Sequence, residues 1–78
     1  MQEIELRLQE HFSDIFRRVW VQPHSRSGQR DVLVTLFYAH RSGYLIISLR
    51  KLSDITFDII LGELQRRINI DELLEDLI

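Results

Sequence analysis

The chain has 78 residues, of which 45% are hydrophobic, with no cysteine and a formal net charge of −2. This length fits one small α+β domain, residues 1–78, and the composition excludes a disulfide scaffold, a thiolate metal site and a disordered chain. The chain starts with neither a basic nor an apolar leader and has no apolar run of roughly 20 residues, so we expect a cytoplasmic protein that does not enter a membrane.

A helix is predicted at the start of the chain, because apolar residues recur there at the spacing of one helical face. These residues are Ile4, Leu8, Phe12, Ile15, Phe16 and Val19. Arg17 and Arg18 then fall near the end of this helix, where cations complement the helix dipole. We therefore discount these two arginines as binding residues.

Three strands are expected next. The segment "VWVQ", residues 19–22, is β-branched and aromatic and stops at Pro23, as in a short edge strand. The segments "DVLVTLFYA" and "YLIISLRKL" are also rich in strand-forming residues. Between them lies "HRSG", residues 40–43, whose Gly43 can adopt the left-handed conformation that closes a hairpin loop.

The hairpin register predicts which side chains share a face of the sheet. With residues 40–43 as the loop, Ala39 lies opposite Tyr44 and Phe37 opposite Ile46. One face is then nearly pure hydrocarbon, and we assign it to the helices. Its members are Val32, Val34, Leu36, Tyr38, Leu45, Ile47 and Leu49. The other face, which we call the mixed face, carries Leu33, Thr35, Phe37, Tyr44, Ile46, Ser48 and Arg50.

A second helix is predicted within residues 52–68, with Ser53 as its N-cap and Asp54 at the positive end of its dipole. Residues 69–78 can form a short acidic amphipathic helix, either joined to the preceding one or separate from it. The apolar side chains of this C-terminal segment are expected to dock on the body, on a second subunit or on a partner; they are Leu73, Leu74, Leu77 and Ile78. The order α-β-β-β-α(-α) implies an α+β fold, a three-stranded antiparallel meander with helices packed on one face.

The mixed face is the predicted contact surface, because helices on one side of the sheet leave it uncovered and exposed apolar patches mark interaction sites. Its expected partner or dimer residues are Leu33, Phe37, Tyr44 and Ile46. The first hypothesis is a non-catalytic interaction or regulatory protein that forms a homodimer or higher oligomer through this face and binds a protein partner. In the alternative reading, Phe37 and Ile46 belong to the core.

A basic loop supports a second hypothesis, nucleic-acid binding. Residues 17–51 hold seven arginines and lysines against one aspartate, while both ends of the chain are acidic. The meander places the loop "PHSRSGQRD", residues 23–31, beside the end of the third strand, so an anion site is expected from His24, Arg26, Arg30, Arg50 and Lys51. Phe37 and Tyr44 would stack on bases. The alternative is a solvated loop in which Arg30 pairs with Asp31 or with another acidic neighbour.

Catalysis is the third hypothesis. His24 and His40 lie at opposite ends of a strand, about 30 Å apart at about 3.3 Å per residue, so they cannot form an acid and base pair within one subunit. The stretch from "SRSG" through "IISLRK" resembles the strand pattern of RelE-type ribonuclease toxins over about a third of the chain. That resemblance implies a small ribonuclease. No catalytic residue, cofactor or metal is predicted.

Overall fold

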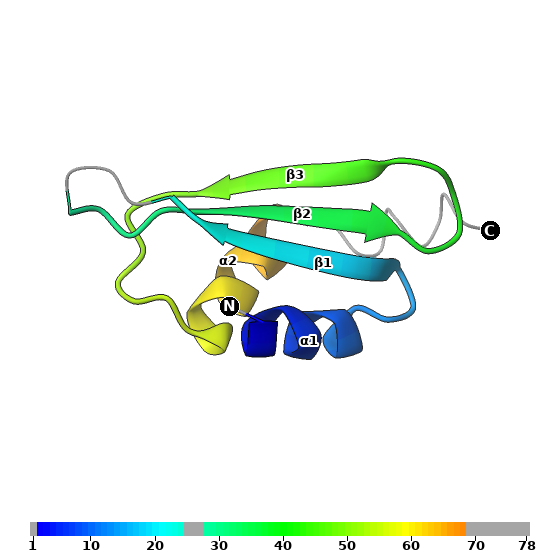
Figure 1. The fold of residues 1–78 in the computed structure, drawn as a ribbon, viewed down its shortest axis with the longest axis horizontal. Helices are drawn as coiled ribbons and strands as arrows, with labels where there is room; N and C mark the ends of the chain where they lie inside the picture. The colour runs from blue at the N-terminus through cyan, green and yellow to red at the C-terminus, as the bar shows by residue number, and fades with distance from the viewer. Residues whose placement is uncertain (1, 25–27, 69–78) are drawn as a thin grey trace.

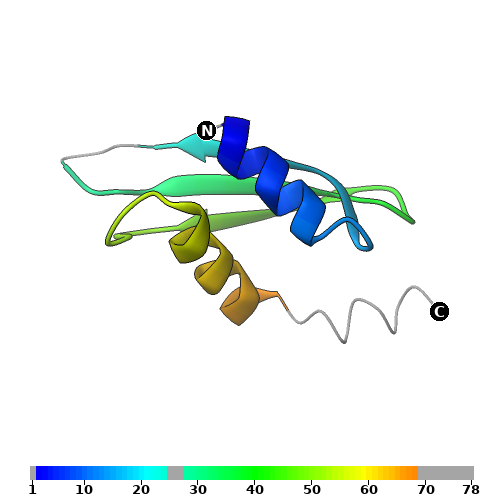
Figure 2. The same cartoon turned by 90° about the horizontal axis from the view of Figure 1, so that it is seen from below.

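A three-stranded antiparallel sheet with two helices on one side of it forms the described part of the chain, residues 2–24 and 28–68, in this computed structural model. The elements are α1 (Gln2–His11), β1 (Phe16–Pro23), β2 (Val32–Tyr38), β3 (Tyr44–Leu49) and α2 (Phe57–Arg67). The strand order is β1-β2-β3, and both helices pack beneath the same face (Figure 1, Figure 2). This confirms the predicted α+β meander. The predicted C-terminal helix, residues 69–78, lies outside the described residues.

The core lies between the sheet and the two helices. Every element contributes side chains that are almost fully buried: Leu8, Phe16, Val19, Val32, Val34, Leu36, Leu49, Ile60 and Leu64. The prediction of which strand face turns inward is confirmed, and Ile46, at 52% exposure, does not belong to the core. No helix among residues 2–24 and 28–68 has the length and apolar character that crossing a bilayer requires.

The first helix is shorter than predicted, because α1 ends at His11 and the chain enters β1 at Phe16. A β-bulge explains the error. The register of β1 shifts between Phe16 and Arg18, so Phe16 and Val19 both face the core although they are three residues apart, a spacing that a helix also produces. Arg17 and Arg18 therefore lie in an exposed part of a strand, not at a helix end.

The β2–β3 hairpin is present, but its register differs from the prediction by two residues. Phe37 lies opposite Tyr44 instead of Ile46. Ala39 does not pair with Tyr44; it follows the end of β2, and its N–H donates to the carbonyl of Ile15 at 2.9 Å, on the β1 side. A shift of two residues leaves every side chain on its predicted face, since alternate residues of a strand point the same way. The mixed face therefore keeps its predicted strand residues.

The second helix begins later than predicted. Thr56 is its N-cap, with a side-chain hydroxyl that accepts the N–H three residues later at 3.4 Å, and Asp58 lies in the first turn in place of Asp54. Ser53 belongs to the connection between the sheet and α2. Ser and Thr are both favoured N-caps, so local sequence does not distinguish them. Packing does, because Leu52 is buried in the core as part of this non-helical connection.

Two leucines of α1 provide a test of how the helix packs. Leu8 is fully buried, whereas Leu6, on the same helix, is 52% exposed. Leu8→Ala should lower the free energy of unfolding by about 2 to 5 kcal/mol through lost burial and cavity formation. Leu6→Ala should change it by less than about 0.5 kcal/mol. Urea denaturation followed by circular dichroism measures both; equal effects would show that α1 does not pack as described.

The position of the N-cap of α2 is tested with a similar pair of variants. Thr56→Ala should cost about 0.5 to 2 kcal/mol of stability, because the N–H of Ile59 loses its acceptor. Ser53→Ala removes the same type of hydroxyl from an exposed connection and should cost less than about 0.5 kcal/mol. The opposite ranking in thermal or urea unfolding would place the start of α2 at Ser53.

Candidate functional site

The mixed face of the sheet has no described helix over it and is the candidate site (Figure 1). In addition to the predicted residues of β2 and β3, it includes residues of β1 that turn away from the core. These are Arg17, Arg18, Trp20 and Gln22. Sequence reasoning missed Arg17 and Arg18 because it extended the first helix over them, and it missed Trp20 and Gln22 because it assigned faces only to the two strands of the hairpin. The alternation of "VWV" around Trp20 was the available signal, since it places this ring on the face opposite to two inward valines.

Three aromatic rings form a row across the three strands of the mixed face. Trp20 of β1 meets Phe37 of β2 edge to face, with ring centroids 5.0 Å apart and an interplanar angle of 71°. Phe37 in turn lies 5.8 Å from Tyr44 of β3, tilted by 49°. Trp20 is 39% exposed and Tyr44 57% exposed. The row is therefore a continuous aromatic surface in contact with water.

Two arginines lie against this aromatic row. The guanidinium carbon of Arg18 is 4.9 Å from the centroid of the Trp20 ring, and that of Arg17 is 5.5 Å from the centroid of Phe37. Both distances are within the range of cation–π attraction. Arg17 stands at the bulge, where one strand contributes an extra residue, and both arginines are exposed. The cations that sequence reasoning discounted are thus the ones in contact with the rings.

The predicted anion site at the other end of the sheet is only partly assembled. His24, Arg50 and Lys51 line one hollow of about 570 Å³, which adjoins the mixed face at Leu33 and Ser48. This much of the predicted cluster comes together. All three basic side chains are exposed.

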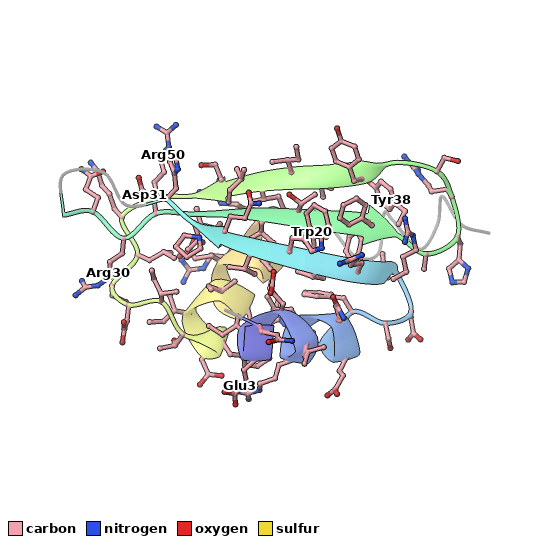
Figure 3. The ribbon with its side chains drawn as sticks, viewed as in Figure 1. Glu3, Trp20, Arg30, Asp31, Tyr38 and Arg50 are labelled. Atoms are coloured by element: carbon pink, nitrogen blue, oxygen red, sulfur yellow. The ribbon has the colours of Figure 1, made fainter. Side chains whose placement is uncertain are left out.

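Two further predicted members of that cluster do not line the hollow. Arg30 is absent from its lining, and Figure 3 shows it pointing in a different direction from Arg50. Arg26 lies outside the described residues.

An aspartate weakens this hollow as an anion site. Asp31 lines it beside Arg50 and Lys51, and its carboxylate accepts the backbone N–H of Lys51 at 2.9 Å. Among the described residues Asp31 forms no ion pair with Arg30, which is one of the two pairings expected of a solvated loop. Its negative charge opposes anion binding in this hollow. A carboxylate also lies near the arginines of the aromatic row, since Glu5 lines one hollow with Arg17, Arg18 and Trp20, but that carboxylate accepts the N–H of Val21.

The histidines lie where the topology predicted. His24 follows β1 at one end of the sheet, and His40 lies in the β2–β3 loop at the other end, so the two do not meet within one chain. In residues 2–24 and 28–68 there is also no group of three or more His, Cys, Asp or Glu side chains arranged to hold a metal ion.

Comparisons with protein families, with curated sequences and with solved structures find nothing that matches this chain.

Proposed function

We propose that this protein is a small non-catalytic binding protein and that the mixed face of its sheet binds single-stranded nucleic acid. The observation that carries the proposal is the exposed row Trp20, Phe37 and Tyr44 with Arg17 and Arg18 against it. Proteins that bind single strands combine aromatic platforms for the bases with cationic side chains for the backbone. The absence of cysteine supports a cytoplasmic setting, which keeps thiols reduced.

The rings supply the sequence-tolerant part of the interaction. Trp20 and Tyr44 are accessible at the two ends of the row, and half-buried Phe37 supports both from between. Stacking of one base on one aromatic side chain contributes roughly 1 to 3 kcal/mol. Bases stack on any such ring because every base has a π-face, so we expect affinity without strong sequence preference.

The acidic net charge is compatible with this proposal because the charges are segregated. The strand residues that make up the mixed face include Arg17 and Arg18 but no carboxylate, and Arg50 follows directly after β3. Most described acidic residues lie on the helices, with Asp14, Asp31 and Asp54 in loops, and Figure 3 shows Glu3 on α1, on the opposite side of the sheet from Arg50. Salt screens exposed charges over about 8 Å at physiological ionic strength. The mixed face thus presents a cationic surface to an approaching phosphate.

The same charges disfavour stacking of two copies through their mixed faces. Such a dimer would enclose four arginines, Arg17 and Arg18 of each copy, in one interface whose strand residues offer no carboxylate to neutralise them. An acidic protein partner would neutralise the arginines, but it would need aromatic or guanidinium groups as well to stack on the aromatic row. Nucleic acid satisfies both features, and a protein partner or regulatory role through this face is the competing outcome of the test below.

The single tryptophan of the chain makes the proposal directly measurable. Trp20 is the only tryptophan, and it lies on the proposed surface. Titration with a 12-nucleotide single-stranded DNA or RNA should quench its fluorescence. The logarithm of affinity should fall linearly with the logarithm of salt concentration, because each neutralised phosphate releases counterions. An acidic peptide of equal charge should bind more weakly. Preference for the peptide would favour the protein-partner reading, and no binding of nucleic acid at about 50 mM salt would remove the proposal.

Variants separate the rings from the cations when binding is followed by anisotropy of a labelled oligonucleotide. Tyr44→Ala should weaken binding by about 1 to 3 kcal/mol and leave the salt slope unchanged. The double variant Arg17→Glu and Arg18→Glu should lower the slope by at least about 1.4, at about 0.7 per phosphate contact. Arg67→Glu, an exposed change on α2, is the control for charge and should have little effect. No loss in Tyr44→Ala, with a loss per changed charge in Arg67→Glu equal to that of the double variant, would point to non-specific attraction by net charge.

A further inference from the structure

The edge of the sheet at β1 is closed by side chains of α1. The N–H of Val19 donates to the side-chain oxygen of Gln9 at 3.1 Å, and the N–H of Val21 donates to the carboxylate of Glu5 at 2.8 Å. The next outward position is Pro23, which has no N–H. All three outward positions from Val19 to Pro23 are thus without a free donor. This prevents another strand from adding here, which is a recognised way of protecting a sheet edge.

Hydrogen bonds at the end of β2 show which backbone groups face which neighbour. The N–H of Ala39 donates to Ile15 on the β1 side, and the N–H of Tyr38 donates to Gly43 on the β3 side. In the central strand of an antiparallel sheet, successive residues direct their N–H and C=O groups alternately to one neighbouring strand and to the other. Even-numbered residues of β2 therefore bond to β3, and their partners include Ile47, which lies opposite Val34.

The edge at β3 is open. With Leu45, Ile47 and Leu49 of β3 bonded to β2, alternation turns the N–H and C=O groups of Tyr44 and Ile46, together with those of Ser48, away from the sheet. No hydrogen bond to these outward N–H groups is found in the part of the chain that the structure describes. The strand "YLIISL" has no charge, no proline and no register shift, so it carries none of the usual protection against pairing.

We propose that β3 pairs in antiparallel fashion with β3 of a second copy of this chain. A two-fold axis at Ile46 places Tyr44 of one copy opposite Ser48 of the other. The three resulting pairs use every outward N–H and C=O group from residue 44 to residue 48, with two hydrogen bonds exchanged in each pair. On the helix side, Leu45 of one copy lies beside Ile47 of the other, so apolar meets apolar. A second copy is therefore a fitting occupant for this edge.

Charge also permits this pairing, in contrast to stacking of two mixed faces. The segment from Tyr44 to Leu49 is uncharged, and the nearest cation on the C-terminal side is Arg50, four residues from the proposed axis. The two copies of Arg50 would lie about 26 Å apart at about 3.3 Å per residue, well beyond a Debye length. No charged side chains meet within the paired segment, residues 44–48; beyond its two ends, the same register directs Arg50 and Lys51 of one copy toward the hairpin loop with Arg41 of the other.

The dimer does not depend on the proposed ligand. It joins two sheets into one of six strands, with both aromatic rows on the same side. A nucleic acid that spans both rows would gain affinity from linkage of the two sites. Failure of nucleic-acid binding would leave the dimer untouched, and a monomer that binds nucleic acid would overturn the dimer alone.

Light scattering coupled to size exclusion tests the oligomeric state. The wild-type protein at about 100 μM should have twice the chain mass of 9.4 kDa. Ile46→Lys places like charges opposite each other at the axis and should give a monomer with an unchanged circular dichroism spectrum, because Ile46 is exposed. Trp20→Lys, on the same face but the closed edge, should remain dimeric. A monomeric wild-type protein, or loss of the dimer in both variants, would overturn edge pairing.

Cysteine cross-linking tests the register, and a chain without cysteine allows it to be done cleanly. Trp20 and Ile46 flank Thr35 in one cross-strand row, so Ile46→Cys and Trp20→Cys are matched variants at opposite edges. Opposed Cα atoms in a hydrogen-bonded antiparallel pair are about 5.5 Å apart, within reach of a disulfide. Mild oxidation should convert Ile46→Cys to a covalent dimer at least tenfold faster than Trp20→Cys. Equal rates, or a faster Trp20→Cys, would contradict the proposal.

Discussion

Burial of one face of a three-stranded sheet against two short helices is the constraint on which the rest of this structure depends. The inward residues of the strands, together with Leu8, Ile60 and Leu64 of the helices, make up the core. Two helices of this length cover one face only, so the opposite face, which carries Trp20 and Tyr44, remains in water. The exposed aromatic row is thus a direct consequence of the small number of elements, and a chain of this size has no further described element to hide it.

The bulge in β1 connects that core to the candidate site. It allows Phe16 and Val19 to enter the core together while Arg17 and Arg18 both stay outside. One extra residue in an edge strand therefore serves packing on one side of the sheet and supplies cations to the rings on the other. A regular strand would have turned one member of each pair to the opposite face, with either a buried arginine or an exposed core residue as the result.

The two edges of the sheet differ in whether their backbone N–H groups have hydrogen-bond partners among the described residues. On β1, side chains of Glu5 and Gln9 occupy the backbone donors of the strand, which also ties α1 to the sheet by hydrogen bonds as well as by apolar contact. On β3, the outward N–H groups have no hydrogen-bond partner within residues 2–24 and 28–68, and the apolar side chain of Ile46 is exposed. Tyr44 and Ile46 belong both to the mixed face and to the β3 edge. Their side chains face the proposed ligand, whereas their backbone N–H and C=O groups would pair with the second copy, so the two kinds of binding would not compete for the same atoms.

The sequence alone determined the order of elements, the α+β class and the inward face of the hairpin, because alternation and helical periodicity are local and survive a register shift of two residues. It placed Phe37, Tyr44 and Ile46 on the mixed face for the same reason. Only the tertiary structure decided where α1 and α2 begin or end, since a bulge imitates helical spacing at Phe16 and Val19, and packing of Leu52 favours Thr56 over Ser53 as the cap. It also decided that Arg17 and Arg18 accompany the aromatic row, and that β1 is closed while β3 is open. Those features depend on contacts between residues far apart in the chain, which no local pattern contains.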